Sequence, residues 1–189
     1  MRSEGRQIAL VRGEPGSGKT RLAREIAERV TARGSRVLYG ACDPAVRMPY
    51  QPLVEALEPA LEILDADAPE PGAGGYPASL TRLLPGLRDR AGDPADEKTD
   101  PDAARHELHV ALTALLARLA RDAPAVLVLD DMQWADASSL ILLRHLARRL
   151  GATPIVVLVL FRAGDGDVSE ALASTLAELH RWTAWCGSG

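Results

Sequence analysis

The sequence has few cysteines and almost no lysine. Cys42 and Cys186 are the only cysteines among 189 residues, and they stand far apart in no metal-binding spacing. This excludes a disulfide framework and a cysteine-rich zinc module, and two reduced thiols are typical of a cytosolic protein. Lys19 and Lys98 are the only lysines, so arginine supplies almost all of the positive charge.

Long apolar segments and a strong charge imbalance are also missing. No apolar run approaches the roughly 18 residues that span a bilayer, and the first seven residues, MRSEGRQ, lack the apolar region of a signal peptide. The net charge of −4 gives no case for binding nucleic acid or an anionic membrane. We therefore expect a soluble, cytoplasmic protein in which residues 1–189 form one domain.

Strand-like and helix-like segments alternate along the chain. Short apolar runs predict strands at residues 7–12, 36–41, 125–129 and 155–161. Periodic apolar residues predict helices at residues 20–33, 53–64, 103–121, 138–150 and 168–180, and the first of these should bury Leu22, Ile26 and Val30. The alternation predicts an α/β fold of three layers, with a mainly parallel sheet between helices.

Other segments carry no chemistry that we can assign. Residues 65–102 contain six prolines and five glycines, which predicts a surface insert with one short helix near residues 80–87. Residues 181–189 predict an irregular tail. His106 and His109 stand one residue short of the H-E-x-x-H zinc motif, so we interpret them as a pair on a helix surface.

A glycine-rich turn, GEPGSGKT, joins the first expected strand to the first expected helix and fits the pattern G-x-x-x-x-G-K-[ST]. Glycines let the backbone wrap tightly, so that successive N–H groups point at phosphate oxygens. Lys19 would reach the β- and γ-phosphates of a nucleotide, and the Thr20 hydroxyl would bind Mg²⁺. The alternative is a turn that merely links strand to helix. The expected nucleotide contacts are Gly13, Pro15, Gly16, Ser17, Gly18, Lys19 and Thr20.

Two adjacent carboxylates, Asp130 and Asp131, follow the third expected strand. Side chains alternate faces along a strand, so the two acids should have different roles. A nucleoside triphosphate site needs a carboxylate near Mg²⁺ at the end of a strand beside the phosphate loop, and we expect Asp130 to fill that role. Asp131 would act as general base or position the attacking water. The alternative for Asp131 is a turn or helix cap.

Three stretches carry a resemblance to a known family: GEPGSGKTRLA, MPYQPLVEAL and VLVLDDMQWADASSLILLRHLARRL. Together they resemble the nucleotide-binding domain of STAND-type signalling ATPases, in particular the large LuxR-type ATP-binding transcriptional regulators and related AAA-like modules of actinobacterial regulators. The resemblance covers about residues 5–179. It implies a P-loop NTPase of the ASCE type, in which the fourth strand separates the phosphate-loop strand from the strand bearing Asp130. It also implies ATP and Mg²⁺ as ligands.

The resemblance extends to residues after the third and fourth strands. Trp134 and Asp136 match a family motif; Trp134 would pack the loop, and Asp136 would cap the following helix. Arg162 stands where similar proteins sense the γ-phosphate, and it would stabilise charge on the transferring phosphate. Leu160 departs from the threonine that is common two residues earlier, and the alternative for Arg162 is a surface arginine.

Related domains begin earlier in their sequences and continue into a fifth strand and a helical lid. We expect both to be missing here, which would leave the strand at 7–12 as an exposed apolar edge. On this hypothesis the chain is part or a fragment of a larger regulator.

Three functions stay open at this point. The first is an ATP-binding signalling switch with slow Mg-dependent hydrolysis, whose output comes from other domains. The second is a nucleotide-binding interaction module without significant turnover, which the aspartate at 131 favours, since Asp is shorter than the usual Glu. The third is a ring-forming AAA-type ATPase, which would need an arginine finger and a lid. The expected partners are ATP and, beyond it, a second copy of the chain or other domains of a larger regulator.

Overall fold

The computed structural model describes residues 7–46, 48–64, 76–87, 100–151, 153–162, 164 and 168–181. Most of the insert predicted at 65–102, and the tail predicted at 181–189 apart from its first residue, therefore lie outside the described residues. Among the helices described, none combines the length and the hydrophobicity that a membrane crossing requires.

Four parallel strands form a sheet in the order β1-β4-β3-β2. Their bounds are Ile8–Gly13 for β1, Arg36–Ala41 for β2, Ala125–Asp130 for β3 and Ile155–Arg162 for β4. Continuous apolar runs place β3 and β4 in the centre, because a strand covered on both faces has no exposed alternate positions; every residue of β3 is buried. The α/β fold is confirmed, and β4 lies between β1 and the strand bearing Asp130.

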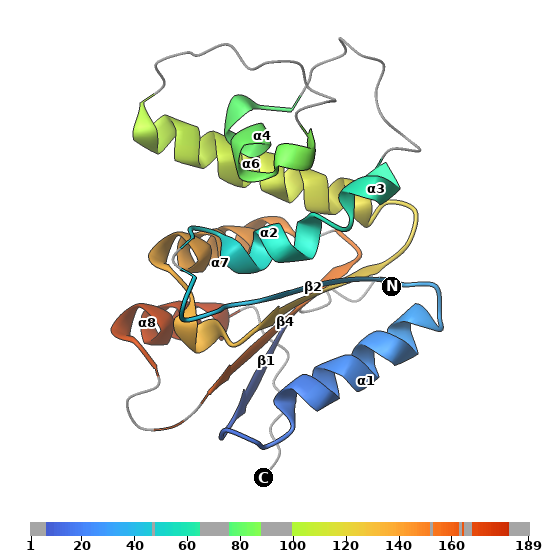
Figure 1. Ribbon diagram of the computed structural model, residues 1–189, viewed down its shortest axis with the longest axis vertical. Helices are drawn as coiled ribbons and strands as arrows, with labels where there is room; N and C mark the ends of the chain where they lie inside the picture. Colours follow the sequence, from blue (N-terminus) through green and yellow to red (C-terminus); the bar gives the residue numbers. More distant parts are fainter. Residues whose placement is uncertain are drawn as a thin grey trace.

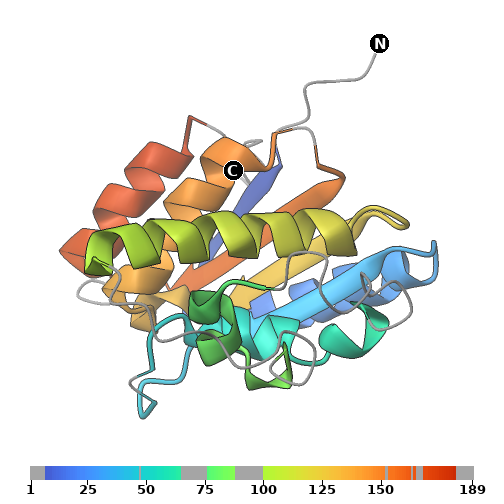
Figure 2. The ribbon, with the colours of Figure 1, turned by 90° about the horizontal axis from the view of Figure 1, so that it is seen from above.

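Helices cover both faces of the sheet (Figure 1). The helix α1, Lys19–Thr31, packs on one face, while α2 (Gln51–Leu57), α7 (Ala137–Arg149) and α8 (Glu170–Leu179) cover the other. A second tier of helices lies outside these, formed by α4 (Ala78–Leu83) and α6 (Pro101–Leu119). Figure 2 shows α6 lying across α7 on the outside of the molecule.

The helix predicted at residues 53–64 is two helices, α2 and α3 (Leu61–Leu64). Pro59 stands in the turn between them, and a proline removes a backbone donor and clashes with the preceding turn of a helix. The short segment predicted near 80–87 is likewise divided into α4 and a 3-10 turn, η2, at Pro85–Leu87.

The face of α1 that meets the sheet differs from the predicted one. Leu22 is 46% exposed, whereas Ala23 is 1% exposed, and Ile26 and Val30 pack against the same small cluster as Ala23. Steps of four residues accumulate about 40° each around a helix of 3.6 residues per turn. The buried stripe therefore passes through Ala23 and leaves Leu22 at its edge.

His109 lies inside the molecule, so the prediction of a surface pair is wrong for this residue. Its side chain is on the face of α6 that turns toward α7, and the residue is 4% exposed. The Tyr50 hydroxyl lies 3.1 Å from Nε2 of His109, and the ring of His145 lies 5.5 Å away between centroids. In the part of the chain that the structure describes, no group of three or more candidate ligands could hold a metal ion.

Gly40 sets how closely α2 approaches the sheet. A Cβ built on Gly40 would collide with the carbonyl oxygen of Pro52 and come within 3.1 Å of the Ala56 backbone nitrogen. The backbone of α2 thus lies directly on the backbone of β2, and no other residue type leaves room for this contact.

We predict that Gly40→Ala lowers the free energy of unfolding by about 3 kcal/mol or more, because overpacking against rigid backbone forces a shift of α2. Gly151→Ala is the matched control, since nothing lies within 4 Å of a Cβ added there. Urea unfolding followed by circular dichroism measures both variants. Equal midpoints for Gly40→Ala and Gly151→Ala would contradict the proposed packing.

Stability should also fall in acid because of His109. Burial, with smaller contributions from the positive charges of His145, Arg105 and His106, lowers the pKa of His109 from 6.5 to about 4. As the pH falls through this window the unfolded chain binds a proton that the folded chain excludes, so folding becomes less favourable.

His109→Gln keeps a hydrogen-bonding side chain but cannot be protonated, so it should flatten the loss of unfolding free energy between pH 6.5 and 4. The control is His180→Gln, at an exposed position just after α8. An equally steep pH profile in His109→Gln would show that another group is responsible.

Candidate functional site

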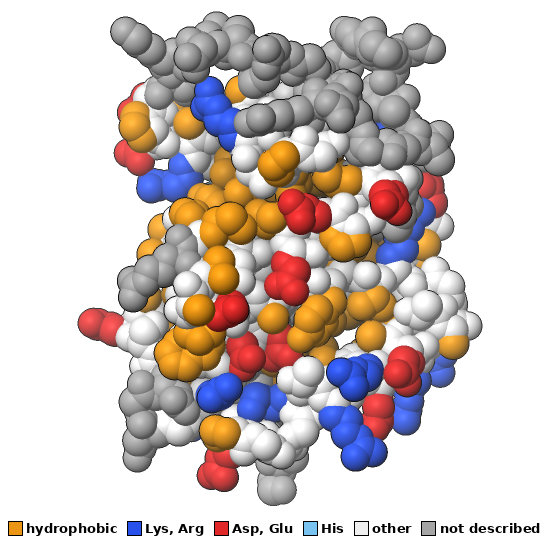
Figure 3. Space-filling model, viewed as in Figure 1, with side chains coloured by type: hydrophobic (Ala, Val, Ile, Leu, Met, Phe, Trp, Pro, Cys, Tyr) orange, Lys and Arg blue, Asp and Glu red, His pale blue; other side chains and the backbone are white. Residues whose placement is uncertain are grey.

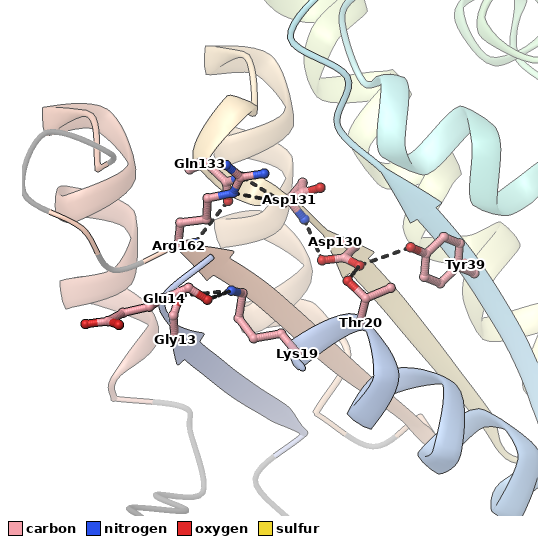
Figure 4. A network of polar contacts seen from close by, with 9 residues as sticks. All are labelled: Gly13, Glu14, Lys19, Thr20, Tyr39, Asp130, Asp131, Gln133 and Arg162. Carbon is pink, nitrogen blue, oxygen red and sulfur yellow. Dashed lines mark hydrogen bonds and ion pairs between the residues drawn. The ribbon is translucent and has the colours of Figure 1, made fainter. Parts of the chain in front are cut away.

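The glycine-rich turn forms a tight loop between β1 and α1 (Figure 4). Gly16 and Gly18 have φ values of 76° and 88°, a left-handed conformation that residues other than glycine rarely adopt. A Cβ on Gly13 would lie 2.5 Å from Oγ of Ser17. The backbone path itself therefore requires glycine at 16 and 18, whereas a side chain at 13 would require the Ser17 hydroxyl to move.

The loop fits an anionic ligand. The first residues of α1 have no capping side chain and no acidic residue, so the partial positive charge of the helix N-terminus is not neutralised locally. Lys19 Nζ donates hydrogen bonds to the carbonyl oxygens of Gly13 and Glu14, both at 2.9 Å, which places its ammonium group within the loop. The Glu14 carboxylate points away from Lys19 in Figure 4. Phosphate oxygens suit such a site.

Asp130 joins the loop to the end of β3. Its carboxylate is buried, with the residue only 2% exposed. Oδ2 accepts hydrogen bonds from Thr20 Oγ1 at 2.8 Å and from the Tyr39 hydroxyl at 3.0 Å, and Oδ1 accepts from the Asp131 backbone N–H at 2.8 Å. Thr20 and Asp130 are 110 residues apart in sequence. Together they offer hydroxyl and carboxylate oxygens, the donors that Mg²⁺ prefers.

Tyr39 is a site residue that sequence reasoning missed. It lies two residues before the end of β2, and β2 pairs with β3 so that Ala41 stands opposite Asp130. Burial of the hydroxyl and the neighbouring carboxylate of Asp130 raise the pKa of Tyr39 to about 12. The one signal in the sequence is an aromatic hydroxyl near the end of a strand, which becomes informative only once the strand order is known.

Asp131 and Arg162 lie together at the ends of β3 and β4 (Figure 4). Asp131 Oδ1 accepts a hydrogen bond from Gln133 Nε2 at 2.8 Å and lies 3.7 Å from Arg162 Nε. Asp131 occupies the N-cap position of the 3-10 turn η3, Met132–Trp134, as the alternative prediction has it, but its side chain makes no capping hydrogen bond. Arg162 pairs with Gly13 in the register of β1 and β4, which places it beside the phosphate loop.

The two motif residues after β3 behave differently. Trp134 is 46% exposed and lines a cavity of about 410 Å³ with Val46 and Met48 of the segment between β2 and α2. Asp136 caps α7 as predicted: its Oδ1 accepts from the backbone N–H groups of Ser138 at 2.8 Å and Ser139 at 3.1 Å.

Charge is unevenly distributed over the face that carries α1. In Figure 3 acidic and hydrophobic side chains share the middle of the molecule, while lysine and arginine side chains gather lower, over α1. The exposed arginines of α1 are Arg21, Arg24 and Arg29.

Comparisons with known proteins place these features in a family context. A profile of the AAA ATPase domain family matches residues 1–159. The chain is 32% identical over 168 residues to an uncharacterized protein of Rhizobium meliloti (strain 1021), covering 82% of this chain and 16% of that protein. The crystal structure of Cdc6p from Pyrobaculum aerophilum has a similar fold, with a TM-score of 0.51 and 20% identity, over 93% of this chain and 37% of that one. The chain thus spans only a minor part of both.

The tyrosine beside Asp130 gives a pH-dependent prediction. Because the pKa of Tyr39 is raised from 10.0 to about 12, the unfolded chain loses this proton before the folded chain does, and stability should fall as pH rises from 10 to 12. Asp130→Asn removes the neighbouring charge, so it should lower the pKa of Tyr39 without restoring it fully, since burial remains.

Ultraviolet absorbance of tyrosinate measures this titration, and Tyr39→Phe identifies which part of the signal belongs to Tyr39. An unchanged Tyr39 titration in folded Asp130→Asn would contradict the hydrogen bond between the two side chains.

Proposed function

The chain belongs to the AAA ATPase domain family, and on this premise we propose that it binds Mg-ATP in the phosphate loop and acts as a signalling switch with slow hydrolysis. The observation that carries this proposal is the 2.8 Å hydrogen bond between Thr20 and Asp130, which brings the loop and the strand-end carboxylate to one place. A linking turn alone does not require these side chains to meet, whereas a magnesium-nucleotide site needs a loop hydroxyl and a strand-end carboxylate near the same ion.

Each loop residue has its own proposed role in binding the nucleotide. Gly13, Gly16 and Gly18 allow the backbone to surround the phosphates, and Lys19 supplies a positive charge beside them. Thr20 and Asp130 would hold Mg²⁺, which supplies charge neutralisation at the phosphates when bound. The remaining proposed contacts are the backbone N–H of Ser17 and van der Waals contact from Pro15, which has no N–H to donate.

Asp131 and Arg162 are the proposed hydrolytic pair. Asp131 would orient the attacking water or accept its proton, and Arg162 would stabilise negative charge on the transferring phosphate. The arrangement supports this assignment because both side chains lie at the carboxyl ends of adjacent strands, with Arg162 beside the first residue of the loop.

The wider role is that of a module in a larger cytoplasmic regulator of the LuxR type, with residues 1–189 acting as one domain. The sequence resemblance supports this. In the Rhizobium meliloti relative, of which the chain covers 16%, a similar segment forms part of a much longer protein. ATP is the proposed ligand, and output would pass to other domains or to a second copy of the chain.

A binding module without significant turnover is the second candidate. The observation that favours it is the state of Asp131, whose Oδ1 already accepts a hydrogen bond from Gln133 and faces Arg162. An oxygen that is engaged in this way is less available to bind and orient an attacking water. The two candidates differ in what Asp131 contributes, and this can be measured.

Binding is tested by titrating labelled ATP with and without Mg²⁺. Lys19→Ala should weaken ATP binding by about tenfold or more, because a charge-assisted hydrogen bond contributes about 1.5–3 kcal/mol. The matched control is Lys98→Ala, which removes the only other lysine. Equal affinities for the Lys19→Ala and Lys98→Ala variants would rule out the phosphate-loop assignment.

Hydrolysis is tested by phosphate release from the same proteins. Asp131→Asn should retain ATP binding but release phosphate about 100-fold more slowly, the lower range for loss of a general base. If phosphate release is unchanged in Asp131→Asn while ATP binding depends on Lys19, the second candidate, a binding module without significant turnover, is supported. A rate per chain that rises steeply with protein concentration would show that a second copy takes part.

A further inference from the structure

A buried amide connects the ends of β3 and β4. Gln133 lies in the turn after β3, and the residue is 6% exposed. One polar atom of its side chain donates a hydrogen bond and the other accepts one. Nε2 donates to Asp131 Oδ1 at 2.8 Å, and Oε1 accepts from the Arg162 backbone N–H at 3.0 Å. The orientation of the amide is fixed by its partners, because a carboxylate can only accept and a backbone N–H can only donate.

The three residues form a closed set of contacts. Gln133 binds both Asp131 and Arg162, and Asp131 Oδ1 also lies 3.7 Å from Arg162 Nε. Without Gln133, Asp131 and Arg162 would be joined only by the 3.7 Å contact between their side chains. Their side chains are 38% and 36% exposed, so water screens the ion pair and it fixes geometry weakly.

The backbone at Asp131 has an uncommon conformation, which bears on where its side chain points. Asp131 has a φ of 52°, a left-handed conformation that is uncommon outside glycine, and its N–H is held by Asp130 Oδ1 at 2.8 Å. This turn directs the Asp131 side chain away from that of Asp130. The hydrogen bond from Gln133 Nε2 then fixes the position of the Asp131 carboxylate.

We propose that Gln133 is the positioning residue of the hydrolytic site: it holds the Asp131 carboxylate in one orientation and ties the strand end that carries Arg162 to it. This inference rests on the proposed function. Gln133 would act through Asp131 and through the backbone of Arg162, to which its hydrogen bonds go. The turn at η3 is thereby part of the site rather than a connection between β3 and α7.

Two size-matched variants separate the two hydrogen bonds. Gln133→Met removes both, whereas Gln133→Glu keeps an acceptor for the Arg162 N–H and loses the donor to Asp131. Both should lower kcat for phosphate release by about tenfold, the scale expected when a reacting group is misplaced by less than 1 Å. KM for ATP should stay within about twofold, since neither bond involves the loop that binds the phosphates.

A double-mutant cycle distinguishes positioning from a general structural effect. If Gln133 acts through Asp131, Gln133→Met should reduce kcat in the wild-type background and have little further effect in Asp131→Asn. Trp134→Phe is the control on the same turn, because Trp134 faces the cavity lined by Val46 and Met48. It should leave kcat and KM unchanged.

The outcomes separate the inference from the function on which it rests. Additive losses from Gln133→Met and Asp131→Asn, or a wild-type kcat in either Gln133 variant, would overturn the positioning role while the ATPase assignment stands. Phosphate release that does not depend on Asp131 would overturn the proposed hydrolysis and the positioning role with it. Unfolding curves and Lys19-dependent ATP binding of each variant show that the fold is intact.

Discussion

The site depends on one buried carboxylate. Asp130 is 2% exposed and carries a charge that is costly to bury unless it is fully hydrogen-bonded. Three donors satisfy it, and they come from different elements: Thr20 from the start of α1, Tyr39 from β2 and the backbone N–H of Asp131 from the end of β3. The requirement of a single buried charge therefore holds the phosphate loop, an edge strand and the central strand in register at the same end of the sheet.

Sequence reasoning was strongest where local chemistry determines the structure. The pattern of Gly13, Gly16 and Gly18 implied a tight loop, and the structure shows a left-handed conformation at the last two and a close approach of the Ser17 side chain at the first. The apolar runs of β3 and β4 implied buried central strands, and the cap at Asp136 was found as expected. The functional roles given to the loop and carboxylate residues stay predictions.

It was weakest where a residue's role depends on what packs against it from far along the chain. The spacing of His106 and His109 predicts a pair on a helix surface, but it says nothing about α7, against which α6 packs and buries His109. Tyr39 and Gln133 carry no motif; each gains its role from a strand neighbour that only the three-dimensional order supplies. Leu22 differs in the opposite direction, since its periodic position predicts a buried side chain and it is 46% exposed.

The Tyr39 hydroxyl shares Oδ2 of Asp130 with Thr20, while the tyrosine itself is 41% exposed. A cation that binds at this oxygen must compete with the phenol, so cation affinity and tyrosine ionisation are thermodynamically linked. By reciprocity, a cation at Asp130 makes the phenol easier to ionise by the same factor by which ionisation strengthens cation binding. The ultraviolet absorbance of tyrosinate at Tyr39, on the edge strand β2, would therefore report the binding of a cation at Asp130.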